Sequence, residues 1–403
     1  MNEQSGTSVG RAAVVGLGTM GAGIAEVFAR NGWQVSGIEV TDAALERGKS
    51  ILVRSTDRAV ETGKLSTADR DDLVGRIEFG GDLAAVADAD VVVEAVFEDL
   101  ATKRNLFADL DRRTRPDALL ATNTSSLSIT AIAAATEHPE RVVGVHFFNP
   151  APVQRLVELI STVLTAPETI ERAQQLLDDL GKTTITCADR AGFVVNTLLV
   201  GYLNRAARLY GEGFASREEI DAAMVEAGNP MGPLTLMDLV GHDVSLAVLH
   251  RMYDETKDRL VAPTPVLTQL VEAGWLGRKT GRGFYGYGPD GVTDAPGPGP
   301  KARASRAGEL PMALLAPYLN SCLKMVGSWY ATPDQIDTGM SLGCRMPKPF
   351  DVLAQLGPRE VLAAQQQIFA ESAEPGDRPA LLLERLAAAD DPATALVALR
   401  EVL

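Results

Sequence analysis

Short apolar runs alternate with helix-like stretches through the first half of the chain, and this alternation predicts an α/β domain. Two runs, 91–95 and 118–122, are almost continuously apolar, as in parallel strands that are buried on both faces. The charged stretch from about 41 to 76 has a helical pattern and predicts a helical hairpin that projects from the sheet. The predicted strands are 11–16, 34–39, 91–95, 118–122, 142–147 and 155–160, with another near 183–187.

Strand signals fade after residue 190, and helical patterns broken by Gly/Pro turns replace them. A Pro/Gly-rich stretch then has the composition of an exposed linker, and helical patterns resume near residue 310. The expected domains are 1–190, 191–288 and 310–403, with a linker at 289–309.

The last helical stretch resembles the one before the linker. Residues 202–241 align with 318–357 without gaps, at a constant offset of 116, and 10 of the 40 positions are identical. Differing apolar positions mostly stay apolar, so we interpret the stretch as a duplicated helical domain. A chance likeness of two amphipathic segments is the alternative. Asn196 falls opposite Met312, so the second copy lacks this polar residue.

The predicted turn after the first strand reads G-x-G-x-x-G. Gly16 permits a tight turn, Gly18 lets the backbone approach a pyrophosphate, and Gly21 lets the following helix pack close to the strand. The N-terminus of that helix offers unpaired N–H groups to phosphates. Glu39 ends the next strand, where a carboxylate binds ribose hydroxyls and would repel a 2′-phosphate. The pattern therefore favours NAD over NADP, against the alternative of an ordinary βαβ turn.

These features give the fold class: α/β, with a Rossmann-like NAD-binding domain followed by two tandem all-α helical domains. The net charge of −15 and the absence of a Lys/Arg block argue against nucleic-acid or membrane binding, and no apolar run is long enough for a membrane span. Three cysteines indicate a cytoplasmic protein, and the four histidines show no metal-binding pattern, so no metal site is expected.

Four polar residues stand in apolar surroundings and predict a site for oxidation of a hydroxyl group. His146 is a candidate base for the hydroxyl proton, and Glu158, 12 residues later, could orient its ring. Ser125 and Asn196 could donate hydrogen bonds to a carbonyl or a developing oxyanion. Each also has a structural interpretation: a buried histidine, an edge-strand glutamate, a helix cap or a solvent-facing amide.

At these residues the chain resembles the L-3-hydroxyacyl-CoA dehydrogenase family. The resemblance covers residues 11 to about 288 and includes G-L-G-T-M-G-A-G-I-A, V-V-E-A-V-F-E, N-T-S-S-L, H-F-F-N-P, G-F-V-V-N, N-P-M-G-P and G-R-K-T-G-R-G-F-Y. The duplicated helical domain is similar to that of long 3-hydroxybutyryl-CoA dehydrogenases. Three positions depart from the pattern: Ala191, Thr197 and His242 stand where the family usually has Pro, Arg and an apolar residue.

The resemblance implies a catalytic dyad of His146 and Glu158, with Ser125 and Asn196 on the substrate. It implies NAD contacts from a larger set: Gly16, Leu17, Gly18, Thr19, Met20, Gly21, Glu39, Glu98, Lys103, Asn149 and Lys279. For coenzyme A it implies Ser55 and Lys64 on the projecting helices, where the resemblance is weakest.

We therefore predict reversible NAD-dependent oxidation of (S)-3-hydroxyacyl-CoA to 3-ketoacyl-CoA, with a short acyl chain such as 3-hydroxybutyryl. Alternatives are a dehydrogenase of another thioester, such as one on a carrier protein, and a non-catalytic NAD-sensing protein. The two helical copies are expected to pack as an intrachain pseudo-dimer in a monomer, with a homodimer as the alternative.

Overall fold

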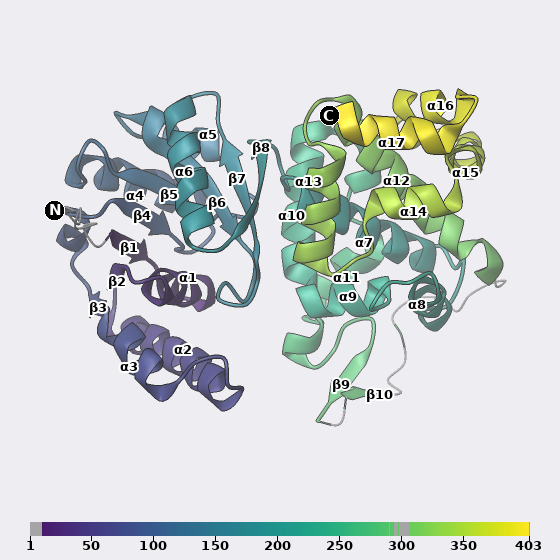
Figure 1. Ribbon diagram of the computed structural model, residues 1–403. Coiled ribbons are helices and arrows are strands. Elements are labelled where there is room, and N and C mark those ends of the chain that lie inside the picture. Colours follow the sequence, from purple (N-terminus) through teal and green to yellow (C-terminus); the bar gives the residue numbers. More distant parts are fainter. Residues whose placement is uncertain (1–9, 290, 294–296, 298–305, 403) are drawn as a thin grey trace. The chain divides into compact units, whose positions relative to one another are not determined.

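The computed structural model describes residues 10–289, 291–293, 297 and 306–402. The chain forms two compact units, Met1–Arg190 and Ala191–Leu403 (Figure 1). The first is built on a β-sheet and the second is mainly helical.

The described part of the first unit contains an eight-stranded sheet, in the order β3-β2-β1-β4-β5-β6-β7-β8. Neighbouring strands are parallel except for β6 and β7, which are antiparallel. The seven predicted strands are all present, each within one residue of its expected bounds. The strands are β1 (Arg11–Val15), β2 (Gln34–Ile38), β3 (Ile77–Gly80), β4 (Val91–Glu94), β5 (Leu119–Thr122), β6 (Val142–Phe147), β7 (Leu156–Ser161) and β8 (Thr183–Ala188).

Helices cover both faces of this sheet and bury an apolar layer on each side, as a parallel sheet requires. On one face, side chains such as Ile24, Leu52 and Leu177 pack against the strands. On the other face, Phe107 and Leu110 do so. The first face is covered by α1 (Thr19–Arg30), α2 (Asp42–Glu61), α3 (Thr67–Gly75) and α6 (Pro167–Asp179), and the second by α4 (Leu100–Arg113) and α5 (Ile129–Ala133).

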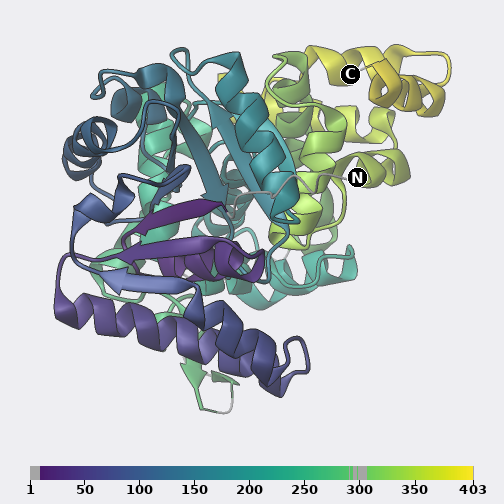
Figure 2. The ribbon, with the colours of Figure 1, turned by 60° about the vertical axis from the view of Figure 1, so that its left-hand side comes forward.

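The predicted helical hairpin is present as α2 and α3. Thr41 caps the first of these helices by accepting a hydrogen bond from the Ala44 N–H, and Ser66 caps the second by accepting one from the Asp69 N–H. The hairpin packs on α1 and lies beside β3 at the edge of the sheet (Figure 2). Strand β3 was not predicted, because it is short and partly exposed at that edge.

The described part of the second unit is helical apart from a small hairpin of β9 (Gly286–Gly288) and β10 (Gly291–Thr293). None of the helices in the described part of the chain has the length and apolar composition needed to cross a membrane. The helices of this unit are α7 (Val195–Gly211), α8 (Arg217–Glu226), α9 (Pro233–Val240), α10 (His242–Thr256), α11 (Pro265–Glu272), α12 (Leu310–Gly327), α13 (Pro333–Thr338), α14 (Pro349–Leu356), α15 (Pro358–Ser372), α16 (Leu381–Ala388) and α17 (Pro392–Val402).

Helix boundaries in this unit repeat at the offset found in the sequence. The bounds of α9, α10 and α11 recur in α14, α15 and α16 with the same spacing of 116 residues at both ends. Helix α12 likewise corresponds to α7: the two end 116 residues apart, and α12 begins one residue earlier. Much of the predicted linker, including 294–296 and 298–305, lies outside the described residues.

Candidate active site

The glycine turn links β1 to α1 at the carboxyl edge of the sheet. Gly16 has a φ of +91°, and a Cβ there would lie 2.7 Å from the Ala95 carbonyl oxygen. A Cβ on Gly21 would lie 1.7 Å from the Gly16 carbonyl oxygen, so this glycine is required for the close packing of helix on turn. A Cβ on Gly18 would meet no protein atom within 4 Å, and no side chain caps the helix there. The turn therefore leaves a small cradle with exposed N–H groups, which fits a pyrophosphate.

Glu39 follows β2 directly and faces this turn. Its Oε2 accepts a hydrogen bond from the Leu17 N–H at 3.0 Å, and its Oε1 accepts one from the Val40 N–H at 2.8 Å. An ionised carboxylate has about four lone-pair positions, so acceptor capacity remains for a ribose diol. The residues fit an adenosine ribose beside the cradle.

Two exposed apolar side chains, which the sequence analysis did not single out, follow the strands on either side of β1. Val40 follows β2 and is 89% exposed, and Phe97 follows β4 and is 83% exposed. Apolar surface exposed at a strand end is a common feature of cofactor sites, because ring systems bury against it. In the sequence, Val40 directly follows Glu39, and Phe97 lies three residues after Glu94.

His146 and Glu158 lie opposite each other on the antiparallel strands β6 and β7. Both are buried, and His146 Nδ1 is 2.7 Å from Glu158 Oε2. The Phe148 ring packs beside the imidazole, with a centroid distance of 4.7 Å. A carboxylate on Nδ1 fixes the tautomer that carries its proton there and so leaves proton transfer to Nε2. The pair has the arrangement that a general acid/base needs.

Ser125 lies in the loop between β5 and α5, and the carboxylate of Glu98 organises this loop. Its Oε1 accepts hydrogen bonds from Thr124 Oγ1 at 2.5 Å, Ser126 Oγ at 3.0 Å and the Ser125 N–H at 3.2 Å. Partial burial would raise the pKa of Glu98, but the Lys103 ammonium and these hydrogen bonds outweigh it and lower the pKa. Glu98 is therefore held as an anion.

Lys103, which the resemblance places at the cofactor, is almost fully buried at 1% exposure. Its Nζ is 2.5 Å from Glu94 Oε1 and 3.2 Å from Glu98 Oε2. Among the predicted site residues, the structure thus brings together Glu98, Lys103 and Ser125. Glu94 was missed, although an acid that ends the apolar run 91–94 is a visible signal in the sequence.

Asn123 links the Ser125 loop to the strand of His146, because its Oδ1 accepts a hydrogen bond from the Phe147 N–H at 2.9 Å.

Asn149 lies exposed in the loop after β6. Lys182 holds that loop by donating hydrogen bonds to the carbonyl oxygens of Ala151 and Gln154. Burial, with a smaller contribution from Arg30, lowers the pKa of Lys182 to about 8.

The remaining predicted residues lie on the helical hairpin or in the second unit. Ser55 lies on α2 and Lys64 follows it, both on the hairpin. Asn196 lies in the first turn of α7, in the second unit. Lys279, also in the second unit, has its Nζ 2.6 Å from both carboxylate oxygens of Asp243. Hydrogen bonding and attraction from Lys279 outweigh burial and lower the pKa of Asp243.

The unusual His242 is fully buried in the second unit. Its Nε2 is 2.6 Å from Asp238 Oδ1, and its Nδ1 is 2.7 Å from the Trp275 carbonyl oxygen. Thr197, another departure, donates its hydroxyl to the carbonyl oxygens of Phe193 and Ala191. The described residues contain no group of His, Cys, Asp or Glu side chains arranged to hold a metal ion.

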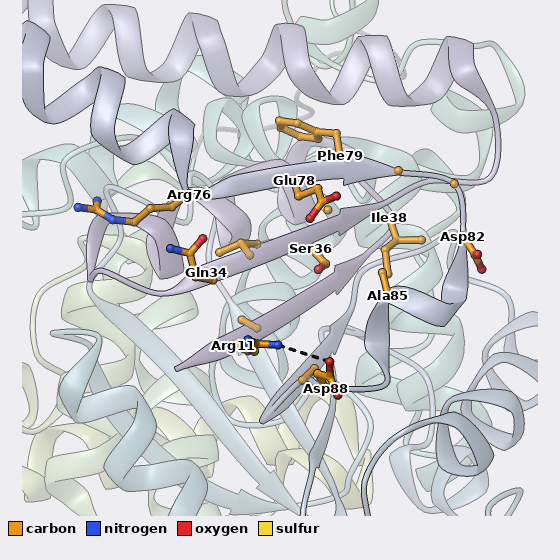
Figure 3. Close-up of a pocket in the computed structure, with 16 residues that line it drawn as sticks. Arg11, Gln34, Ser36, Ile38, Arg76, Glu78, Phe79, Asp82, Ala85 and Asp88 are labelled. Atoms are coloured by element: carbon orange, nitrogen blue, oxygen red, sulfur yellow. Dashed lines mark hydrogen bonds and ion pairs between the residues drawn. The ribbon is translucent and has the colours of Figure 1, made fainter. Parts of the chain in front are cut away.

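A hollow of about 610 Å³ lies over β1, β2 and β3 and contains none of the predicted site residues (Figure 3). It exists because the β3–β4 connection carries only a short 3-10 turn, Leu83–Val86, on that face. Its lining contains both positive and negative side chains: Arg11 is paired with Asp88, and Glu78 lies beside Ser36 on the neighbouring strand. It lies on the face of the sheet, whereas the candidate site lies at the strand ends.

Comparison with known proteins gives the same assignment along nearly the whole chain. Residues 11–190 match the model of the NAD-binding domain of 3-hydroxyacyl-CoA dehydrogenase, and 192–287 and 312–395 match that of its C-terminal domain. A 3-hydroxybutyryl-CoA dehydrogenase of Mycobacterium tuberculosis is 47% identical over 283 residues, covering 70% of this chain and 99% of the relative.

Two Escherichia coli proteins add to this. A 3-hydroxyadipyl-CoA dehydrogenase is 44% identical over 277 residues, covering 68% of this chain and 58% of the relative. The crystal structure of a 3-hydroxybutyryl-CoA dehydrogenase is similar with a TM-score of 0.84 at 32% identity, covering 94% of this chain and 98% of the other. The second match extends through both helical segments.

Proposed function

The chain belongs to the 3-hydroxyacyl-CoA dehydrogenase family and is an NAD-dependent oxidoreductase, and from this premise we propose that it acts on short 3-hydroxyacyl-CoA thioesters such as 3-hydroxybutyryl-CoA. Relatives that are 41–47% identical and named 3-hydroxybutyryl-CoA dehydrogenase support the short acyl chain. The observation that carries the proposed chemistry is the 2.7 Å contact between His146 Nδ1 and Glu158, at the carboxyl end of β6.

In oxidation, His146 takes the proton of the 3-hydroxyl group at Nε2, and in reduction it returns that proton. Glu158 holds the ring through Nδ1 and stabilises the imidazolium. Ser125 and Asn196 donate hydrogen bonds to the 3-oxygen or the thioester carbonyl. Bound NAD supplies the hydride acceptor.

The NAD contacts proposed for the first unit are the glycine turn from Gly16 to Gly21, Glu39, Glu98, Lys103 and Asn149. From the second unit we propose Lys279. The carboxylate of Glu39 would repel a 2′-phosphate, which favours NAD over NADP. Ser55 and Lys64 are proposed for coenzyme A, since an exposed lysine and a hydroxyl on a projecting hairpin suit its phosphates.

The test is NADH oxidation with acetoacetyl-CoA, repeated with NADPH, with longer 3-ketoacyl-CoAs, with 3-ketoadipyl-CoA and with acetoacetyl on an acyl carrier protein. We expect the highest kcat/KM with acetoacetyl-CoA and NADH. A preference for 3-ketoadipyl-CoA would move the assignment toward the substrate in the name of the 44% identical relative. Turnover only with the carrier protein, or NADH binding without turnover, would contradict the proposal.

We also propose that 191–288 and 310–403 are two copies of one domain that pack as an intrachain pseudo-dimer. Asn204 and Asn320 each bridge their helix to a following loop, through contacts that recur at the same offset. Asp221 and Asp337 likewise accept the N–H of Leu234 and Phe350.

Equivalent residues of the two copies also meet each other. The rings of Tyr202 and Tyr318, which align in the repeat, lie 5.6 Å apart between centroids on α7 and α12. Such a contact between equivalent positions is typical of a two-fold interface. A protein truncated at residue 289 is then expected to dimerise through α7 in light scattering, and a stable monomer would contradict the pseudo-dimer. We further propose a cytoplasmic location, which is supported by three cysteines that are not joined in disulfides: Cys187, Cys322 and Cys344.

A further inference from the structure

We propose that Glu94 is a positioning residue for the Ser125 loop (residues 123–128), acting through Lys103 and Glu98. This rests on the proposed function, in which Ser125 contacts the substrate. The dyad does not require Glu94, whose interactions form a continuous chain through buried Lys103 to Glu98 and the loop.

Glu94 is the last residue of β4 and is fully buried. Its Oε1 accepts hydrogen bonds from Lys103 Nζ at 2.5 Å and from the Val96 N–H at 2.7 Å, and its Oε2 accepts one from Thr122 Oγ1 at 2.6 Å. Removing two charges from water costs free energy that offsets their attraction, so the buried Glu94–Lys103 pair is not explained by stability alone. Its position at the carboxyl edge of the sheet favours a role in ordering the site.

Lys103 carries the connection from Glu94 to Glu98. Its ammonium touches the buried carboxylate of Glu94 and, at 3.2 Å, that of Glu98, which is about one-third exposed. One cation thus serves two anions. Loss of the charge on Glu94 would leave Lys103 with Glu98 alone and draw that carboxylate toward the interior.

Glu98 in turn holds three consecutive residues of the loop through Oε1. The donors are the hydroxyls of Thr124 and Ser126 and the backbone N–H of Ser125, and none of these contacts uses the Ser125 hydroxyl. A second route runs from Glu94 to the loop, because Thr122 Oγ1 also accepts a hydrogen bond from the Thr124 N–H at 3.3 Å. The loop backbone is therefore fixed at Ser125 while its side chain is left to the substrate.

Small displacements of a group that contacts the reacting atoms lower rates strongly, by about 100-fold for 1 Å in well-ordered sites. Glu94→Gln keeps the shape of the side chain and removes its charge. We expect kcat/KM for acetoacetyl-CoA to fall about tenfold, with the dissociation constant for NADH changed less than threefold.

A double-mutant cycle with Ser125→Ala separates positioning from a structural role. If Glu94 acts through Ser125, then Glu94→Gln lowers kcat/KM less than twofold once Ser125 is Ala. An equal tenfold loss in both backgrounds would overturn the proposal. If Glu94→Gln does not fold, the same cycle is measured with Thr122→Val, which removes one hydrogen bond to Glu94.

The matched control is Asp111→Asn, since Asp111 forms another buried ion pair of this unit, with Arg141 at 2.6 Å, and lies outside the site. It is expected to lower the melting temperature without coupling to Ser125. Hydrogen exchange of the loop amides gives a readout independent of turnover and of the proposed substrate. We expect exchange at Ser125 and Leu127 to accelerate in Glu94→Gln and not in Asp111→Asn, and unchanged exchange in Glu94→Gln would overturn the proposal.

Discussion

Two buried histidine–carboxylate pairs lie in the described part of the chain, one in each unit, and they differ in the structure that surrounds them. In the first unit, Glu158 contacts Nδ1 of His146 across antiparallel strands, and the proposed proton transfer uses Nε2. In the second unit, His242 places Nε2 on Asp238 and Nδ1 on a backbone carbonyl. Both ring nitrogens of His242 thus lie within 2.7 Å of protein oxygen atoms in the buried interior of this unit.

Asp238 shows what the second pair does. Besides His242, it accepts hydrogen bonds from the N–H groups of Phe284 and Tyr285 and from the Tyr287 hydroxyl. With the bond from His242 to Trp275, the pair ties residues 275–287 to α9 and α10. A close histidine–carboxylate contact alone therefore does not identify a catalytic dyad. The position of the pair separates the two: His146 lies on β6 at the carboxyl edge of the sheet, whereas His242 contacts an aspartate that holds neighbouring backbone groups.

The largest expected effect is from His146→Gln. Loss of the proposed acid/base should lower kcat for acetoacetyl-CoA reduction by about 10³-fold. NADH binding, measured by fluorescence, should change little because the ring does not form the nucleotide turn. His242→Gln is the matched variant, and a kcat loss as large as that of His146→Gln would break the comparison.

Glu158→Gln should have the next largest effect. The amide keeps the size of the side chain but no longer stabilises an imidazolium, so we expect kcat to fall about 10²-fold with a smaller change in KM. Steady-state kinetics over a pH series measures this. A kcat within threefold of the native value would remove Glu158 from the dyad.

Asp238→Asn should act on stability instead. Loss of the carboxylate that accepts three hydrogen bonds in this buried cluster should lower the free energy of unfolding by about 3 kcal/mol. Urea unfolding of the native and variant proteins measures it, and kcat at a temperature well below the transition should stay within about threefold. Unchanged stability with a large loss of kcat would assign this pair to the reaction.

The smallest effect is expected from His138, whose Nδ1 lies 3.3 Å from Asp111 and whose side chain is 54% exposed. Solvent screens such a pair, so His138→Ala should change the free energy of unfolding by less than about 1 kcal/mol and leave kcat unchanged. A melting curve and one activity assay are sufficient. A larger loss of unfolding free energy or of kcat would show that solvent exposure does not determine how much such a pair contributes.

Much of the first unit could be predicted from the sequence because local patterns determine it. The glycine turn, the apolar strands and the capped hairpin depend on residues close together in the chain. The family motifs also led to His146 and Glu158, but their register required knowing that β7 returns antiparallel to β6. Strand β3 was missed because a short edge strand has little apolar pattern.

Long-range polar contacts were the least predictable part. Glu94 was counted as part of an apolar strand, and its three partners come from separate segments of the chain. Lys103 was expected at the cofactor, but its burial and its contacts with Glu94 and Glu98 could not be read from the sequence. The partners of His242 include a backbone carbonyl 33 residues away, which no spacing rule predicts.

The most direct test of the dyad is a crystal structure of the protein with NAD and acetoacetyl-CoA bound. We expect the 3-oxygen to lie about 2.6–3.2 Å from His146 Nε2, with Glu158 still in contact with Nδ1. A 3-oxygen out of reach of His146, or beside His242, would contradict it.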